Sequence, residues 1–255
     1  MAAARSQSGK WFRSPIIFVG EIAILLMESV RRSFTRPFEV REIFSQMAFV
    51  GVSSVPIVAL TSFASGAVLA LYLSELLVEN GGGELVGAVI GLSVTRELAP
   101  VIAGIMVAAR CGSAMAAQIG TMAVTEQIDA LRSLAVHPYN YLLVPRVLAC
   151  LFMLPILGLV GTYGGMVGGL LVSASIGVPS SQFLRSVEVY LEPWDFVGGL
   201  YKTAAFGVIV ALVSCQQGLR THGGAVGVGR STTNAVVVSM VLIYVANYFL
   251  AALFY

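Results

Sequence analysis

The 255-residue sequence has very little charge. Only 11% of its residues are Asp, Glu, Lys or Arg, whereas 57% are hydrophobic and the mean hydropathy is +0.88. Soluble domains carry about 25% charged residues. The chain is therefore predicted to be an all-α integral membrane protein. Its basic residues form no stripe interleaved with aromatic residues, so we expect no nucleic-acid partner.

Lysine and histidine are also scarce, which excludes several kinds of active site. The only lysines are Lys10 and Lys202, and no Gly-x-x-x-x-Gly-Lys-Ser/Thr motif is present, so this chain cannot supply a P-loop. The histidines, His137 and His222, belong to no zinc-protease motif, and Gly-x-Ser-x-Gly is absent. The three cysteines have no metal-ligand spacing and are predicted to be apolar packing residues. We expect no catalytic residue, metal or cofactor in this chain.

Five apolar segments are long enough to cross a bilayer, which takes about 20 residues. They run approximately over 47–73, 85–109, 147–176, 196–217 and 232–254. Lys202 lies near the start of the fourth segment, where its long side chain is expected to reach the membrane interface. The apolar stretch 15–27 is interrupted by Glu21 and lacks a cleavage site, which predicts a retained interfacial helix. The predicted parts are thus an N-terminal cytoplasmic region, 1–46, and a five-span domain, 47–255.

Basic residues flank alternate ends of the five segments. Twelve Lys or Arg residues lie before the first segment and in the second and fourth connections, against two on the other side, Arg185 and the nearby Lys202. Lys and Arg concentrate on the cytoplasmic side of membrane proteins. The N-terminus is therefore predicted to lie in the cytoplasm and Tyr255 outside.

Glycines recur every four residues in the third segment, at Gly161, Gly165 and Gly169. Such a ridge lets two helices pack closely, either within one subunit or across a dimer. We find no internal repeat of the kind that many secondary transporters contain.

An adjacent cation and anion, Arg96 and Glu97, lie inside the second segment. An ionisable side chain at bilayer depth costs at least about 2.5–3.5 kcal/mol on insertion scales. Pro100 has no N–H, so the carbonyl of Arg96 loses its helical partner. Neighbouring helical residues point about 100° apart, so one of the pair is expected to reach another span or another subunit. The pair is either a structural ion pair or a polar site on a substrate path.

Residues 121–138 predict an amphipathic helix in the cytoplasmic connection between the second and third spans. Thr125 is expected to cap its start and Pro138 to end it. Its apolar stripe consists of Ile128, Leu131, Leu134 and Ala135. Such a helix either lies on the membrane surface or docks into a groove of a soluble partner.

Four stretches resemble the MlaE/YrbE family, whose members are permeases of lipid ABC transporters that work with MCE-domain proteins. They are Arg-Glu-Leu-Ala-Pro at 96–100, Ala-Arg-Cys-Gly-Ser-Ala at 109–114, Gly-Thr-Met-Ala-Val-Thr-Glu-Gln-Ile-Asp-Ala-Leu at 120–131, and Pro145-Arg146. The resemblance extends from about residue 40 to the C-terminus, and the Glu-Gln-Ile-Asp-Ala-Leu stretch is its most distinctive part. Ala99 departs from the family, because many relatives have Gly there.

The resemblance implies a homodimeric permease that moves phospholipid between membranes, with a cytoplasmic ATPase that binds ATP–Mg and an MCE-domain protein on the far side. It implies the bacterial inner membrane, with the plastid inner envelope as the alternative; the short N-terminus favours the bacterial one. It also implies that residues 121–138 are the coupling helix, and the ATPase contacts are expected at Glu126, Gln127, Asp129 and Arg132. The alternative function is an ion- or proton-coupled secondary carrier that uses Glu97.

We further hypothesise a lipid cavity enclosed by the first and second spans of two copies. Arg96 would attract the lipid phosphate, Glu97 would neutralise Arg96 in the empty site, and the carbonyl freed by Pro100 would accept hydrogen bonds from the headgroup. The acyl chains would contact apolar residues of the first span, namely Val58, Leu60, Phe63 and Leu69.

Overall fold

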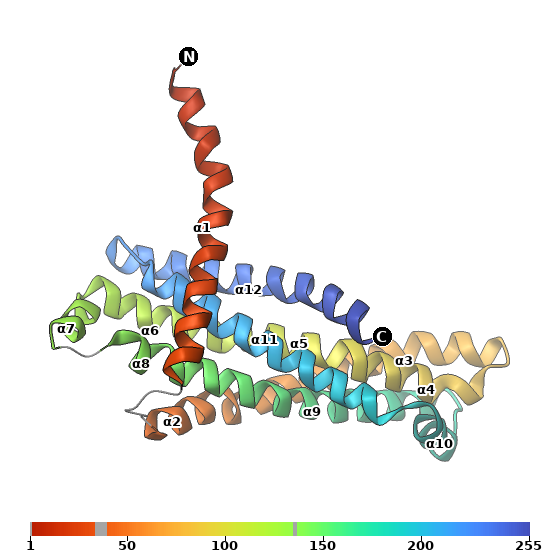
Figure 1. The fold of residues 1–255 in the computed structure, drawn as a ribbon. Coiled ribbons are helices and arrows are strands. Elements are labelled where there is room, and N and C mark those ends of the chain that lie inside the picture. Colours follow the sequence, from red (N-terminus) through yellow and green to blue (C-terminus); the bar gives the residue numbers. More distant parts are fainter. Residues whose placement is uncertain (1, 34–39, 135–136) are drawn as a thin grey trace.

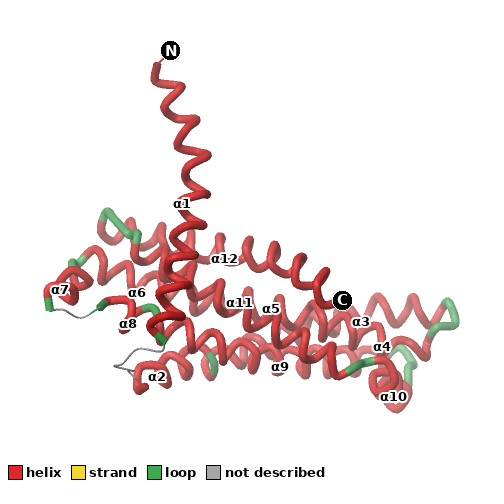
Figure 2. The backbone as a smooth tube through the Cα atoms, in the orientation of Figure 1, coloured by secondary structure: helices red, strands yellow, loops and turns green. Residues whose placement is uncertain are grey.

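A computed structural model describes residues 2–33, 40–134 and 137–255, and of residues 2–16 the backbone alone. All regular structure in these ranges is helical (Figure 2). Within these described ranges, five segments are long and apolar enough to cross a membrane: Val40–Glu79, Gly83–Val124, Pro138–Ser175, Pro193–Leu219 and Gly224–Phe254. The predicted all-α class with five spans is therefore confirmed.

Several spans are built from more than one helix. The first contains α2 (Val40–Val50), η1 (Val52–Ser54) and α3 (Val55–Glu79), and the predicted division after residue 46 falls inside α2. The second contains η2 (Gly83–Leu85), α4 (Val86–Ser93), η3 (Val94–Leu98), α5 (Ala99–Val107), η4 (Ala108–Gly112) and α6 (Ser113–Val124). The third contains α8 (Pro138–Leu142) and α9 (Val144–Ser175), the fourth is α11 (Pro193–Leu219) and the fifth is α12 (Gly224–Phe254).

The spans form an elongated bundle with short helices at both ends (Figure 1). α7 (Gln127–Ser133) and α8 lie at one end, and α10 (Ser180–Tyr190) lies at the other. α1 (Ala2–Arg32) crosses the bundle steeply near the α7 end, and its N-terminal half stands clear of the other helices. The interfacial position of α1 in a membrane stays a prediction.

Polar contacts attach α1 to the bundle at two points. Glu21 accepts hydrogen bonds from Gln216, at 2.8 Å, and from Arg220, at 2.6 Å, both near the end of α11. Arg32 donates a hydrogen bond of 3.0 Å to Asn140 in α8. α1 therefore connects the helix after α7 with the end of the fourth span.

The glycine ridge of the third span packs against α3 of the same chain. A Cβ atom at Gly66 would lie 2.0 Å from the carbonyl oxygen of Gly165, and one at Gly168 would lie 2.2 Å from that of Phe63. Only glycine allows two backbones to approach so closely. Of the two interpretations of the ridge, the structure thus shows the contact within one subunit.

The connection after α6 departs from the predicted single helix over 121–138. Thr125 ends α6, and its hydroxyl donates to the Thr121 carbonyl at 2.8 Å, so the prediction that Thr125 caps the next helix is wrong. Glu126, with φ of 58°, reverses the chain before α7. α7 ends at Ser133 and Pro138 begins α8, so Pro138 does not end the predicted helix. Ala135 of the predicted stripe lies outside the described residues.

The close glycine contact between α3 and α9 generates a first prediction. Gly66→Ala should lower the free energy of unfolding by about 1–3 kcal/mol, because the added methyl meets backbone that cannot move aside cheaply. Gly229→Ala is the matched control, since a Cβ there meets nothing within 4 Å. The measurement is unfolding of the purified protein in mild detergent by titration with SDS. Equal stability of the two variants would contradict the packing assignment.

Candidate functional site

The charged pair of the second span lies in the π-helical turn η3. The N–H of Ala99 bonds to the carbonyl of Val94, five residues earlier, instead of four. Pro100 follows directly and has no N–H to give to the Arg96 carbonyl. π-Helical turns of this kind occur often at functional sites.

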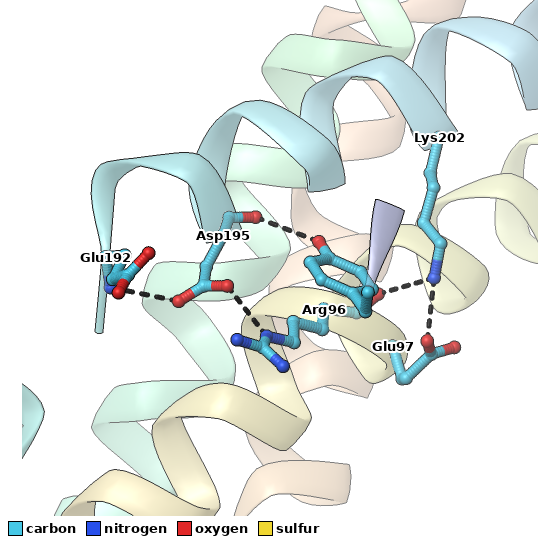
Figure 3. A network of polar contacts seen from close by, with 6 residues as sticks. Arg96, Glu97, Glu192, Asp195 and Lys202 are labelled. Atoms are coloured by element: carbon cyan, nitrogen blue, oxygen red, sulfur yellow. Dashed lines mark hydrogen bonds and ion pairs between the residues drawn. The ribbon is translucent and has the colours of Figure 1, made fainter. Parts of the chain in front are cut away.

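Arg96 and Glu97 each form an ion pair with a residue of α11. The Nε of Arg96 lies 2.7 Å from Oδ1 of Asp195, and Oε1 of Glu97 lies 2.7 Å from Nζ of Lys202. Figure 3 shows the two side chains of η3 pointing away from each other toward these partners. The expectation that one of the pair reaches another span is confirmed, for both residues. The expectation that Glu97 neutralises Arg96 is wrong, because neighbouring positions of a helix face in different directions.

Lys202 is fully buried rather than at the interface, so that expectation is also wrong. Its Nζ donates to Glu97 and, at 2.9 Å, to the main-chain carbonyl of Arg96 (Figure 3). The Arg96 carbonyl, which Pro100 leaves without a helical partner, therefore accepts a hydrogen bond from Lys202 and is not left for a ligand. A buried ammonium group needs such partners, because an unpaired charge in an apolar interior is strongly destabilising.

Asp195 and Asn247 complete the charge network, which we define as Arg96, Glu97, Asp195, Lys202 and Asn247. Oδ2 of Asp195 accepts the N–H of Glu192 at 2.9 Å, in a capping box at the start of α11. Asn247 of α12 donates to Oε2 of Glu97 at 2.7 Å. The network thus joins the second, fourth and fifth spans.

Sequence reasoning missed three members of this network. The sequence singles out neither Asp195 nor Asn247, and it places Lys202 at the membrane interface. The Glu-x-x-Asp spacing at 192–195 is the signal for a capping box, which fixes the position of Asp195. An acid within a span, such as Glu97, also calls for a cation elsewhere in the membrane, and Lys202 is the only lysine within the five spans.

The network contains an inner and an outer pair of charges. The side chains of Asp195 and Lys202 are 2% and 0% exposed, whereas those of Arg96 and Glu97 are 36% and 41% exposed. The two cations and two anions balance. An accessible cation and an accessible anion can therefore contact a polar ligand while the inner pair holds them in place.

The four residues expected to line a cavity do not share one face of α3. Val58 is fully buried and Leu69 is partly buried against the core. Leu60, 69% exposed, and Phe63, 36% exposed, lie on the opposite face. The helical period of 3.6 residues separates these two pairs. Leu60 and Phe63 are accessible on the surface of this chain, and Val58 is not.

The polar residues of the α7 region face outward. Glu126, Gln127, Asp129 and Arg132 are exposed, and Asp129 pairs with Arg132 at 2.9 Å. Ile128 is buried and attaches the helix to the core, but Leu134 of the predicted stripe is 73% exposed. A groove of about 610 Å³ lies between α1, α7 and the end of α11, and Glu126 and Asp129 line it. This surface is accessible to a partner.

The pairing of Lys202 generates a second prediction. Lys202→Met leaves the Glu97 carboxylate without its cation and should lower the free energy of unfolding by about 2 kcal/mol, less than for a fully buried pair because Glu97 is part exposed. Adding Glu97→Gln removes the unpaired charge and should recover part of the loss. Unfolding in detergent measures both variants. A double variant less stable than Lys202→Met would argue against the pairing.

Comparison with known proteins agrees with this architecture. A protein-family model described as Permease MlaE matches residues 43–253. The probable ABC transporter permease protein slr1045 of Synechocystis is 45% identical over 216 residues, which cover 84% of this chain and 82% of the relative. A probable ABC transporter permease protein of Rickettsia bellii is 42% identical over 238 residues, 93% and 92% of the two chains. The chloroplastic protein TRIGALACTOSYLDIACYLGLYCEROL 1 of Arabidopsis thaliana is 38% identical over 248 residues, 96% of this chain and 71% of the relative. The chain therefore belongs to the MlaE permease family and is a permease subunit of an ABC transporter.

Proposed function

We propose that this permease moves phospholipid between membranes, together with an MCE-domain protein. The observation that carries the proposal is the charge network, which presents an accessible cation and an accessible anion inside an apolar bundle. A phospholipid has chemistry complementary to this site, with a charged headgroup and long apolar chains. The Arabidopsis relative bears the name of a lipid, trigalactosyldiacylglycerol, which supports a lipid as the transported molecule.

Arg96 is assigned to the lipid phosphate in this proposal, because guanidinium groups bind phosphate through two parallel hydrogen bonds. Glu97 is assigned to a cationic headgroup. The acyl chains run along exposed apolar residues of α3, including Leu60 and Phe63. A second copy of the chain closes the cavity, since these residues lie on the outer surface of a single copy. The freed carbonyl of Arg96 has no part in headgroup binding, because Lys202 occupies it.

An ABC transporter permease works with an ATPase and a substrate-binding partner. We place the ATPase on α7, because the polar residues there are exposed. ATP–Mg binds to that ATPase, and the permease responds by switching between two packings. α6 continues through η4, α5 and η3 to the charge network, so a movement of α7 acts on the same helical span that carries Arg96 and Glu97.

The membrane assigned to this permease is the bacterial inner membrane, with the N-terminus in the cytoplasm and Tyr255 outside. The basic residues near the α7 end support this orientation. The plastid inner envelope is the alternative, since one relative is chloroplastic. A secondary carrier driven through Glu97 is set aside, because the chain belongs to a family of ABC transporter permeases.

The lipid site is tested by a third prediction. Arg96→Gln should lower phospholipid transfer about tenfold or more, because a hydrogen bond to a charged group contributes about 1.5–3 kcal/mol. Transfer is measured between vesicles with the complete complex of permease, ATPase and MCE-domain protein. Arg185→Gln is the control, because Arg185 is exposed on α10 and is not a member of the charge network. Unchanged transfer by Arg96→Gln in an intact complex would remove the site assignment.

The ATPase contact is tested by a fourth prediction. Asp129→Arg places a second cation beside Arg132 and should reduce co-purification of the ATPase and the stimulation of ATP hydrolysis by lipid. Glu188→Arg makes the same change of charge on α10, at the opposite end of the bundle, and should leave both quantities unchanged. If Asp129→Arg leaves both the co-purification of the ATPase and the stimulation of ATP hydrolysis unchanged, the docking role of α7 is wrong.

A further inference from the structure

The aromatic ring of Tyr255 covers the charge network. Its centroid lies 4.5 Å from Cζ of Arg96 and 5.3 Å from Nζ of Lys202. Its hydroxyl donates to the main-chain carbonyl of Asp195 at 3.3 Å. A Cβ atom at Gly198 would lie 2.6 Å from the tyrosine oxygen, so the glycine leaves room for this contact. Two independent contacts thus place the ring over both cations.

Tyr255 and Asp195 together restrict the guanidinium of Arg96. Asp195 binds the Nε edge, and the central Cζ atom of the guanidinium lies over the face of the tyrosine ring. Neither Nη nitrogen donates a hydrogen bond to a residue that the structure describes. With a side chain 36% exposed, Arg96 therefore offers its remaining edge outward, in an orientation fixed from two sides.

We propose that Tyr255 is a positioning residue that holds the guanidinium of Arg96 in the orientation that binds a phosphodiester. This inference rests on the lipid site proposed above and adds to it a residue that favours lipids with phosphate over uncharged lipids. An arginine side chain has many rotamers, and fixing one before binding removes an entropy loss from the binding step. The ring also stabilises the cation at its face, which leaves the Nη edge for two parallel hydrogen bonds to phosphate oxygens.

A ring that served only to pack the ends of α11 and α12 would have different effects. Its removal would weaken the binding of every lipid with the same acyl chains, charged or not. A positioning role predicts a loss confined to lipids that carry phosphate. A positioning role also predicts that Tyr255→Phe retains normal lipid binding, because phenylalanine keeps the aromatic face over Arg96.

The experiment compares binding of two lipids to the complete transporter complex in detergent. One probe is fluorescent phosphatidylethanolamine, and the other is diacylglycerol with the same chains and label but no phosphate. Tyr255→Leu should weaken binding of phosphatidylethanolamine about three- to tenfold, in the range of one cation–π contact, and should change diacylglycerol binding less than about twofold. Tyr255→Phe should bind both lipids within about twofold of the wild type.

Two further variants make the test decisive. Tyr248→Leu is the matched control, because Tyr248 is 71% exposed on α12 and its ring contacts that of Phe249. Tyr255→Met has a side chain of similar length without an aromatic face, and it replaces Tyr255→Leu if that variant does not assemble. Equal loss for both lipids, a loss in Tyr255→Phe as large as in Tyr255→Leu, or equal effects of Tyr255→Leu and Tyr248→Leu would each overturn the proposal.

Arg96→Gln in the same assay separates this inference from the proposed function. If Arg96→Gln leaves phosphatidylethanolamine binding unchanged, the lipid site itself is wrong, and the role of Tyr255 is wrong with it. If Arg96→Gln lowers binding but Tyr255→Leu does not, the lipid site stands and the positioning role alone is overturned.

Discussion

The ammonium group of Lys202 is the constraint on which the arrangement of the spans depends. A fully buried cation requires an anion and further acceptors, because its desolvation is otherwise uncompensated. Glu97 supplies the anion, and the main chain of Arg96 supplies the acceptor. That acceptor exists because Pro100 has no N–H to donate to it. Pro100 on the second span therefore frees the acceptor that Lys202 on the fourth span uses.

This interaction unites two interpretations that the sequence left separate. Arg96 and Glu97 are members of structural ion pairs, and both also remain accessible. In Arg96 the two roles fall on different atoms. Nε of Arg96 binds Asp195, whereas its Nη nitrogens donate to none of the described residues. Oε1 and Oε2 of Glu97 bind Lys202 and Asn247 on a side chain that is still 41% exposed. A site held by internal ion pairs is fixed before its ligand arrives, as binding with little reorganisation requires.

Length and composition were enough to predict the five spans, and charge was enough to single out Arg96 and Glu97. Their partners could not be predicted, because Asp195 and Lys202 lie about a hundred residues away, and the pairing depends on how α11 packs against η3. Thr125 shows the limit of local rules. A threonine before acidic residues is typical of a helix start, but here its hydroxyl bonds backward to Thr121 and ends α6 instead. Glu126 then makes the turn with a positive φ that no sequence rule assigns to glutamate.

The second span carries two π-helical turns. Each contains an arginine that binds a neighbouring span, the fourth in one case and the first in the other. Arg96 in η3 reaches α11, and Arg110 in η4 donates to the carbonyl of Phe49 and the hydroxyl of Ser54, beside the start of α3. Fourteen residues at about 1.5 Å each separate them by about 21 Å along the helix. Single π-helical turns inside α-helices occur frequently at functional sites. A displacement of α7 that is transmitted along the second span therefore crosses both turns before it reaches the charge network, and at each turn an arginine binds a neighbouring span.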